Sequence, residues 1–205
     1  MAAAPGNSNA HVHAVLLAAG SSKRFGAGNK LLAEIKGEPL VRRVASALLA
    51  SHAEEVVVVV GHEASKVASA LKRLDVQRVF NADFEEGLAS SLRSGIDALP
   101  AEARGAMIVL GDMPGITAKL VDRLIARFDK EGGLKIVYPE NAGGEQGNPV
   151  IWPRAVFPEL MALEGDRGAK ALLQEHADDC VAVSVKGDAA FRDVDTPDDL
   201  EAGQK

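Results

Sequence analysis

Five consecutive valines, Val56–Val60, constrain the fold of this chain more than any other segment. β-Branched residues favour strands, and a strand that is apolar on both sides has to be covered on both faces. Such strands occupy the centre of parallel sheets, whose crossover connections place helices on each side. The run therefore predicts an α/β protein with a mostly parallel sheet between two layers of helices.

Strand and helix patterns alternate along the rest of the chain. Apolar residues at helical spacing predict helices over 40–49, 63–73, 88–99 and 118–130, and shorter ones near 153–161 and 166–176. The apolar runs between them predict strands that end near Gly20, Phe80, Leu110 and Tyr138, with further short strands at 150–152 and 180–185. This order predicts a Rossmann-like, three-layer α/β/α architecture with right-handed crossovers.

Length and composition fit one globular domain. The chain has 205 residues, of which 47% are hydrophobic and 25% charged, so we expect a mobile tail over residues 1–10 and a single domain over residues 11–205. No apolar run reaches the ~18 residues that a membrane span needs. A net charge of -6 argues against a nucleic-acid binder, which would carry a basic face. The single cysteine, Cys180, cannot form an internal disulfide, which favours a cytoplasmic protein.

The loop after the first expected strand has the pattern of a phosphate-binding site. From Leu17 to Lys30 it reads Leu-Ala-Ala-Gly-x-Ser-x-Arg-x-Gly-x3-Lys. Small residues let backbone N–H groups approach a polyphosphate, and Arg24 and Lys30 supply positive charge. The spacing excludes a Walker A loop, because Lys30 is followed by Leu31, and a dinucleotide fingerprint, because the third glycine is missing. The loop therefore predicts a polyphosphate site of another kind.

Acidic residues in two other segments suit a metal ion. Asp112 follows a predicted strand, at the edge where open α/β sheets bind their ligands, and one or two carboxylates with phosphate oxygens hold Mg²⁺. Asp193 and Asp195 alternate along an extended segment, so both point to the same side. A turn residue is the alternative for Asp112, whereas Asp198 and Asp199 are expected to cap the following helix. We therefore predict a Mg²⁺ site at Asp112 with Asp193 or Asp195.

Five segments, taken in order, resemble the MobA-like nucleotidyltransferase superfamily: Leu17–Lys30, Gly111–Pro114, Gly147–Val150, Gly165–Ala169 and Asp193–Asp199. Within it the chain is most similar to the molybdenum cofactor cytidylyltransferases, because guanylyl-transferring relatives read Leu-Ala-Gly-Gly where this chain has Leu-Ala-Ala-Gly. The stretch from Asn81 to Ile96 also resembles cytidylyltransferases, in which a serine at the helix start helps to bind the base. Ser91 matches that serine best, and a helix cap is the alternative role.

The resemblance implies Mg²⁺-dependent transfer of a cytidylyl group from CTP to the terminal phosphate of the molybdopterin (molybdenum) cofactor, with release of pyrophosphate. It implies a nucleotidyltransferase fold, and a molybdoenzyme or its chaperone as a further partner. Catalytic roles fall to Arg24, Lys30 and Asp112. The expected nucleotide-binding residues are Leu17, Ala18, Ala19, Gly20, Ser21, Ser22, Arg24, Lys30, Gly61, Asn81 and Ser91, and the expected acceptor-binding residues are Gly147, Asn148, Pro149 and Arg167.

Three alternatives stay open. The first is a nucleotidyltransferase that uses another nucleoside triphosphate or another phosphorylated acceptor on the same fold. The second is an NAD(P)H-dependent oxidoreductase, as some relatives are reported to be, although the intact carboxylates and the missing dinucleotide fingerprint argue against it. The third is a non-catalytic chaperone that hands over the cofactor. Loss of Lys30 or Asp112 would favour the chaperone, and both residues are present.

Overall fold

The computed structural model describes residues 11–22, 25–26, 28–166, 169–188 and 190–202. The expected tail over residues 1–10 lies outside these residues, so the division of the chain into a tail and one domain stays a prediction. Seven strands form one sheet in the order β5-β4-β1-β6-β8-β7-β9. In chain order they are β1 (Val12–Ala18), β4 (Val56–Val60), β5 (Gln77–Phe80), β6 (Gly105–Leu110), β7 (Ile136–Glu140), β8 (Val150–Pro153) and β9 (Cys180–Ser184).

The sheet is mostly parallel, as predicted. β1 pairs in parallel with β4 and with β6, β4 pairs in parallel with β5, and β7 pairs in parallel with β9. Only β8 runs against its neighbours β6 and β7. All five valines of β4 are buried, and β4 lies between β1 and β5. The valine run thus forms the doubly covered inner strand that its composition indicates.

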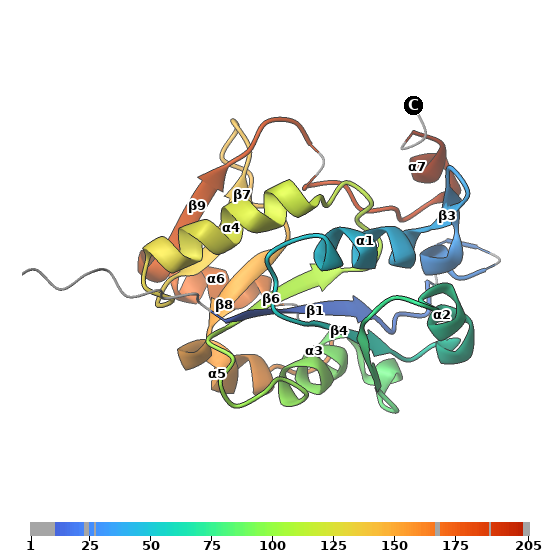
Figure 1. The fold of residues 1–205 in the computed structure, drawn as a ribbon, viewed down its shortest axis with the longest axis horizontal. Coiled ribbons are helices and arrows are strands. Elements are labelled where there is room, and N and C mark those ends of the chain that lie inside the picture. The colour runs from blue at the N-terminus through green and yellow to red at the C-terminus, as the bar shows by residue number, and fades with distance from the viewer. Residues whose placement is uncertain (1–10, 23–24, 27, 167–168, 189, 203–205) are drawn as a thin grey trace, which may run out of the picture.

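Helices cover both faces of the sheet (Figure 1), with α1 and α4 on one face and α3 and α5 on the other. Each face of the sheet has its own hydrophobic core, the first under α1 and α4 and the second under α3 and α5. Because side chains alternate along β1, Ala14 and Leu16 pack in the first core and Val15 and Leu17 in the second. Among the described residues, no helix is both long and apolar enough to cross a membrane. The helices are α1 (Leu40–Leu49), α2 (Ala64–Ala70), α3 (Leu88–Asp97), α4 (Ala118–Lys130), α5 (Phe157–Met161), α6 (Lys170–Glu175) and α7 (Pro197–Ala202).

Two local features differ from the expected elements. A short hairpin of β2 (Glu34–Ile35) and β3 (Glu38–Pro39) precedes α1, because Lys36 and Gly37 both adopt positive φ and reverse the chain. Strands of two residues show no periodicity, so the sequence did not indicate them. The helix expected near 153–161 divides into a 3₁₀ turn and α5, with Pro158 in the first turn of α5. The 3₁₀ turns are η1 (Lys30–Leu32), η2 (Phe84–Glu86), η3 (Arg154–Val156) and η4 (Ala177–Asp179).

Gly95 lets α3 lie close against the sheet. A Cβ atom at this position would lie 2.2 Å from Val15 Cγ1 and 3.1 Å from Val59 Cγ2, two buried valines of the inner strands. Gly95→Ala should therefore lower the free energy of unfolding by about 1–3 kcal/mol, because overpacking outweighs the ~1 kcal/mol that alanine gains in a helix.

Urea unfolding followed by circular dichroism measures this change. Ser94→Ala, at a half-buried position of the same helix, is the matched control and should stay within about 0.5 kcal/mol of the parent. A Gly95→Ala protein as stable as the parent would contradict the close packing of α3 on β1 and β4.

Candidate active site

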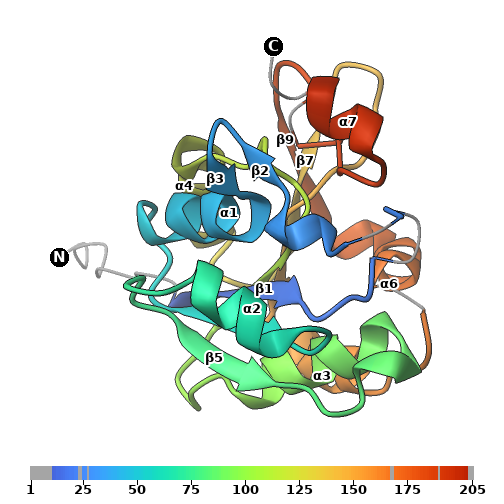
Figure 2. The same cartoon turned by 90° about the vertical axis from the view of Figure 1, so that its right-hand side faces the viewer.

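The carboxyl ends of β1, β4 and β6 meet at one edge of the sheet, and Figure 2 shows this end of β1 toward the viewer. Two backbone hydrogen bonds join the end of β1 to the segments that follow β6 and β4. Gly111 N donates to Leu17 O at 3.1 Å, and His62 N donates to Ala19 O at 3.0 Å. The phosphate-binding pattern and Asp112 therefore lie side by side, as expected of ligand sites in open α/β sheets.

The loop after β1 folds back on itself and carries Lys30 to this edge. Ser22 has a φ of 52°, and its backbone carbonyl accepts a hydrogen bond from Phe25 N at 2.9 Å. The Ser22 hydroxyl accepts a second bond from Lys30 N at 3.2 Å. Asn29 Oδ1 accepts from Leu31 N at 3.1 Å and so starts the η1 turn. Arg24, the other expected cation, lies outside the described residues.

This loop forms one wall of a cavity of about 590 Å³, which we call the polar cleft. Most of the expected nucleotide-binding residues line it. Ala18 does not, because its side chain points to the opposite face of β1 and packs in the first core. Further walls come from Phe84, Gly87 and Asp166. The predicted residues on the walls are Leu17, Ala19, Gly20, Ser21, Ser22, Lys30, Ser91, Asp112 and Asp195.

Lys30 forms ion pairs with two carboxylates in the polar cleft. Its Nζ lies 2.6 Å from Asp112 Oδ2 and 2.9 Å from Asp195 Oδ1. Burial is the largest single influence on the Lys30 pKa and lowers it, but the charges and hydrogen bonds of Asp112 and Asp195 together raise the pKa above the usual lysine value. The ammonium group is therefore positively charged throughout the neutral pH range.

Three carboxylates gather around this lysine. Asp112, Asp193 and Asp195 each offer an oxygen, and these oxygens lie within 4.8 Å of one another. Asp112 Oδ1 is buried and has no hydrogen-bond partner among the described residues. A buried carboxylate oxygen without a partner is costly, and hard divalent cations bind oxygen ligands of this kind. The donor set thus fits a divalent cation.

The C-terminal segment is fixed by a buried side chain and by a helix cap. Val194 is 3% exposed, packs with Ile35 and Leu40, and donates its backbone N–H to Asp112 O at 2.9 Å. Asp199 accepts from Asp195 N at 3.1 Å and from Thr196 N at 2.8 Å. The hydrogen bonds from Thr196 and Asp195 hold the Asp199 pKa below its usual value. Asp199 therefore acts as the expected cap and also orients the backbone of Asp195.

Two of the expected nucleotide-binding residues lie behind the cleft wall. Asn81 is 3% exposed, and its Nδ2 donates to Ser90 Oγ at 2.9 Å and to Ser91 Oγ at 3.1 Å. α3 begins at Leu88, so Ser91 lies within the helix and does not cap it. Asn81 thus positions the hydroxyl of Ser91, a residue that borders the cleft.

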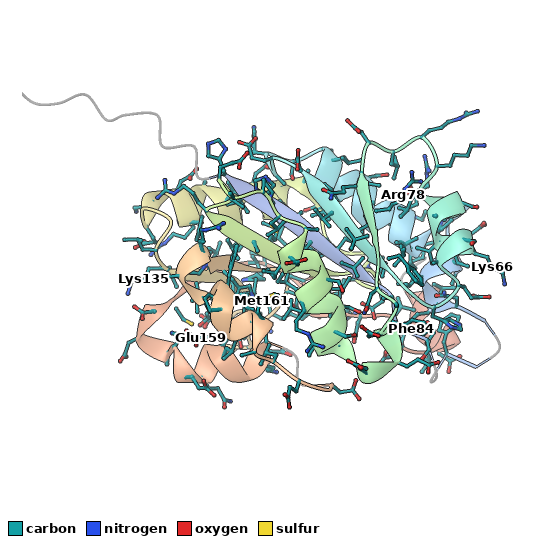
Figure 3. The ribbon with its side chains drawn as sticks, turned by 90° about the horizontal axis from the view of Figure 1, so that it is seen from below. Lys66, Arg78, Phe84, Lys135, Glu159 and Met161 are labelled. Carbon is teal, nitrogen blue, oxygen red and sulfur yellow. The ribbon has the colours of Figure 1, made fainter. Side chains whose placement is uncertain are left out.

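Gly61, the second of these residues, makes room for an aromatic wall. A Cβ atom on Gly61 would lie 2.6 Å from Phe84 Cβ and 2.9 Å from Ala19 Cβ. Phe84 is half-buried and borders the polar cleft, and Figure 3 shows it beside the end of α3. The sequence analysis did not single out Phe84, because an isolated aromatic residue in a short turn has no periodicity that would mark it.

The expected acceptor residues border a second cavity of about 180 Å³, which we call the apolar cavity. Gly147 and Asn148 line it, whereas Pro149 is buried beside it. A Cβ atom on Gly147 would lie 2.6 Å from Phe191 and 2.7 Å from Ala190 O, so glycine allows this loop to lie against the C-terminal segment. Arg167 lies outside the described residues.

The fold and the site together define an α/β protein of the nucleotidyltransferase class. Residues 14–180 match the MobA-like NTP transferase domain, and the chain belongs to this family. The resemblance noted in the sequence is thereby confirmed at the level of the superfamily.

Two relatives are similar along nearly their whole length. The chain is 28% identical over 195 residues to a nicotine blue oxidoreductase of Paenarthrobacter nicotinovorans, which covers 92% of this chain and 94% of the relative. It is 29% identical over 203 residues to a probable molybdenum cofactor guanylyltransferase of Natronomonas pharaonis, with 93% and 96% covered. The family thus includes relatives named for different activities.

Solved structures agree with the fold. The crystal structure of the Mycobacterium tuberculosis rv0371c homologue from Mycobacterium sp. strain JC1 has a TM-score of 0.83 and 30% identity, with 96% of both chains covered. Rv0371c of M. tuberculosis H37Rv, in complex with manganese, has a TM-score of 0.78 and 25% identity, with 94% of this chain and 97% of that chain covered. A divalent metal in a similar structure agrees with the carboxylate cluster found here.

Asp112→Asn should weaken Mn²⁺ binding by at least ~10-fold, because it replaces a buried anionic ligand by a neutral amide. Electron paramagnetic resonance of free Mn²⁺, with and without a nucleoside triphosphate, measures the affinity. Asp198→Asn removes an exposed carboxylate outside the cluster and is the matched control. Equal Mn²⁺ affinity in the parent and in Asp112→Asn would exclude this site as the metal centre.

Proposed function

We propose that the protein transfers a cytidylyl group from CTP to the terminal phosphate of the molybdopterin cofactor and releases pyrophosphate. The observation that carries this proposal is the position of Lys30, which lies between Asp112 and Asp195 at the end of a small-residue loop. A cation and a carboxylate cluster at the carboxyl ends of parallel strands suit a triphosphate bound with a divalent ion. The probable guanylyltransferase relative supports the acceptor class.

The loop residues from Leu17 to Ser22 would surround the triphosphate, with Lys30 and Arg24 neutralising its oxygens. Gly20 meets no atom within 4 Å at its Cβ position, so a phosphate can approach the backbone there without a clash. A lysine side chain is cationic at neutral pH and so suits that role. Backbone N–H groups and a fixed cation stabilise phosphate charge better than a mobile solvent shell does.

Asp112, with Asp195 and Asp193, would hold Mg²⁺, whose oxygen preference matches these ligands. When bound, the ion would neutralise charge on phosphate oxygens. The chain's own residues orient the reactants. Asp199 and Val194 fix the backbone that carries Asp195 and Asp193. The choice of Mg²⁺ among divalent ions is part of the proposal, because the similar solved structure is a complex with manganese.

The reaction needs no protein base. An oxygen of the acceptor's terminal phosphate forms a bond to the α-phosphorus of CTP, while the bond from that phosphorus to the bridging oxygen of the β-phosphate breaks. The electron pair leaves with pyrophosphate. A phosphate dianion is already nucleophilic, so positioning and charge stabilisation carry the catalysis. Lys30 is suited to stabilise the negative charge that develops between the α-phosphate and the leaving group.

Ala19 is the residue that most directly bears on the choice of nucleotide. It is 3% exposed, borders the polar cleft and lies against Gly61 and Phe84. Its methyl group narrows the cleft where guanylyl-transferring relatives have glycine, which favours a pyrimidine over a purine. Ala18 faces the other side of β1, so its methyl group does not affect which nucleotide is preferred.

Lys30→Ala should lower kcat of pyrophosphate release by ~10²–10³-fold, because it removes a cation that acts on developing charge. A coupled pyrophosphate assay with CTP and molybdenum cofactor measures the rate. Lys66→Ala, an exposed lysine on α2 outside the cleft, is the matched control. If Lys30→Ala changed only KM for the acceptor, the loop would not hold the triphosphate.

The parent protein should prefer CTP to GTP by more than ~10-fold in kcat/KM, which corresponds to about 1.4 kcal/mol of differential transition-state binding. Ala19→Gly should reduce this preference, because it removes the methyl group that borders the base. Ala18→Gly is the matched control and should keep the preference. Equal use of both triphosphates by the parent would exclude the cytidylyl assignment and leave nucleotidyl transfer intact.

An oxidoreductase is the second candidate, because nicotine blue oxidoreductase is 28% identical over 195 residues. The cluster of carboxylates around Lys30 argues against a hydride-transfer site, which has no need of it. NAD(P)H consumption with a heteroaromatic substrate, measured alongside pyrophosphate release, separates the two activities.

A non-catalytic chaperone for a molybdoenzyme would show neither activity while still binding the cofactor. We also propose that the reaction takes place in the cytoplasm, which the single cysteine of the chain favours.

A further inference from the structure

The segment that follows α5 brings a carboxylate to the polar cleft. Asp166 borders the cleft, on the side formed by the start of α3. Gly165 O accepts a hydrogen bond from Ala89 N at 3.0 Å, so this segment is fixed to the first turn of α3. A Cβ atom on Gly87 would lie 2.5 Å from Gly165 C and 2.7 Å from Asp166 Oδ1. Glycine at position 87 therefore lets the carboxylate lie directly against the start of the helix.

The two sides of the cleft differ in charge. The Asp166 side chain has no hydrogen-bond or ion-pair partner among the described residues. Ser91 borders the same side, one helical turn after Gly87, whereas Lys30 borders the cleft from the η1 turn. A triphosphate is attracted by the lysine and repelled by an unpaired carboxylate. A nucleotide in this cleft therefore places its phosphates at Lys30 and its nucleoside beside α3.

We propose that the Asp166 carboxylate accepts a hydrogen bond from the exocyclic amino group of cytosine and so distinguishes CTP from UTP. This inference rests on the proposed function, because it assigns a contact with the base to the CTP site named there. It adds a discrimination that Ala19 cannot make. The methyl group of Ala19 separates pyrimidines from purines by size, whereas cytosine and uracil have rings of the same size.

The chemistry of the two bases explains why a carboxylate can tell them apart. At ring position 4 cytosine carries an amino group that donates hydrogen bonds, and uracil carries a carbonyl oxygen that accepts them. An ionised carboxylate only accepts, so it pairs with the amino group and repels the carbonyl oxygen. The Ser91 hydroxyl donates as well as accepts and therefore suits either base. An acceptor-only group near Ser91 thus provides the discrimination that the hydroxyl lacks.

Glu85 is the other carboxylate that borders the described part of the cleft outside the metal cluster. It lies in the η2 turn, and its side chain is exposed, as is that of Asp166. The longer glutamate side chain loses more rotamer freedom when it is held against a ligand. Asp166 is therefore the better reader of the base. Because the two side chains carry equal charge, Glu85→Gln is a matched control that also removes one negative charge from the cleft.

Isothermal titration calorimetry with Mg²⁺, without acceptor, measures nucleotide binding. The parent should bind CTP more tightly than UTP by ~10–100-fold, the range expected of a hydrogen bond to a charged group. Asp166→Asn should reduce this preference to less than ~3-fold, because an amide can donate to the uracil carbonyl as well as accept from the cytosine amine. Glu85→Gln should keep the preference. Equal affinity of the parent for both nucleotides, or a preference that survives Asp166→Asn, would overturn the proposal.

A second pair of nucleotides tests whether the carboxylate contacts the base or the ribose. Asp166→Asn should weaken the binding of CTP and of 2′-deoxy-CTP by the same factor, because both carry the amino group. A loss confined to CTP would assign the carboxylate to the ribose 2′-hydroxyl and refute the proposal.

Binding and transfer are measured separately, so their failures can be told apart. A CTP preference that depends on Asp166, in a protein that releases no pyrophosphate, would support the base contact and refute the proposed transfer reaction. Pyrophosphate release from CTP with molybdenum cofactor, with an unchanged preference over UTP in Asp166→Asn, would refute the base contact and support the transfer reaction.

Discussion

Lys30 joins three segments that are far apart in the sequence. It belongs to the loop after β1, Asp112 follows β6, and Asp195 lies 165 residues further along the chain than Lys30. With Asp193, the three carboxylates exceed the single lysine in charge by two units. In a partly buried cleft such an excess is unfavourable unless another cation offsets it. The arrangement around Lys30 thus explains why the cluster fits a divalent ion and why the C-terminal segment lies against the loop.

Alternation along β1 assigns opposite tasks to neighbouring residues. Ala14, Leu16 and Ala18 pack under α1 and α4, whereas Leu17 and Ala19 face the cavities beside α3. One strand therefore supplies both core and ligand site, and the sequence Leu-Ala-Ala-Gly has a separate physical role at each position. Leu17 borders both the polar cleft and the apolar cavity.

Much of the fold could be predicted because its signals are local. The valine run, the helical spacing of apolar residues in α4 and the Thr117 cap each depend on residues close in sequence. The proximity of the loop after β1 to Asp112 followed from the rule that strand ends share one edge. Asp193 and Asp195 were expected there for another reason, because a Mg²⁺ site needs carboxylate oxygens. The hairpin before α1 and the aromatic wall at Phe84 could not be predicted. They depend on turns of two residues or on contacts between distant segments, and neither leaves a periodic pattern.

The ion pairs of Lys30 also bear on the order of binding. Asp112 Oδ2 and Asp195 Oδ1 are occupied by Nζ, and removing one partner of a partly buried ion pair leaves an uncompensated charge. Lys30 can therefore turn toward a phosphate only when another positive charge takes its place beside the carboxylates. Asp112 Oδ1, which has no hydrogen-bond partner among the described residues, would be available to a divalent ion bound with a triphosphate, and a phosphate oxygen would be available to Lys30 Nζ. On these grounds the free nucleotide should bind more weakly than its metal complex.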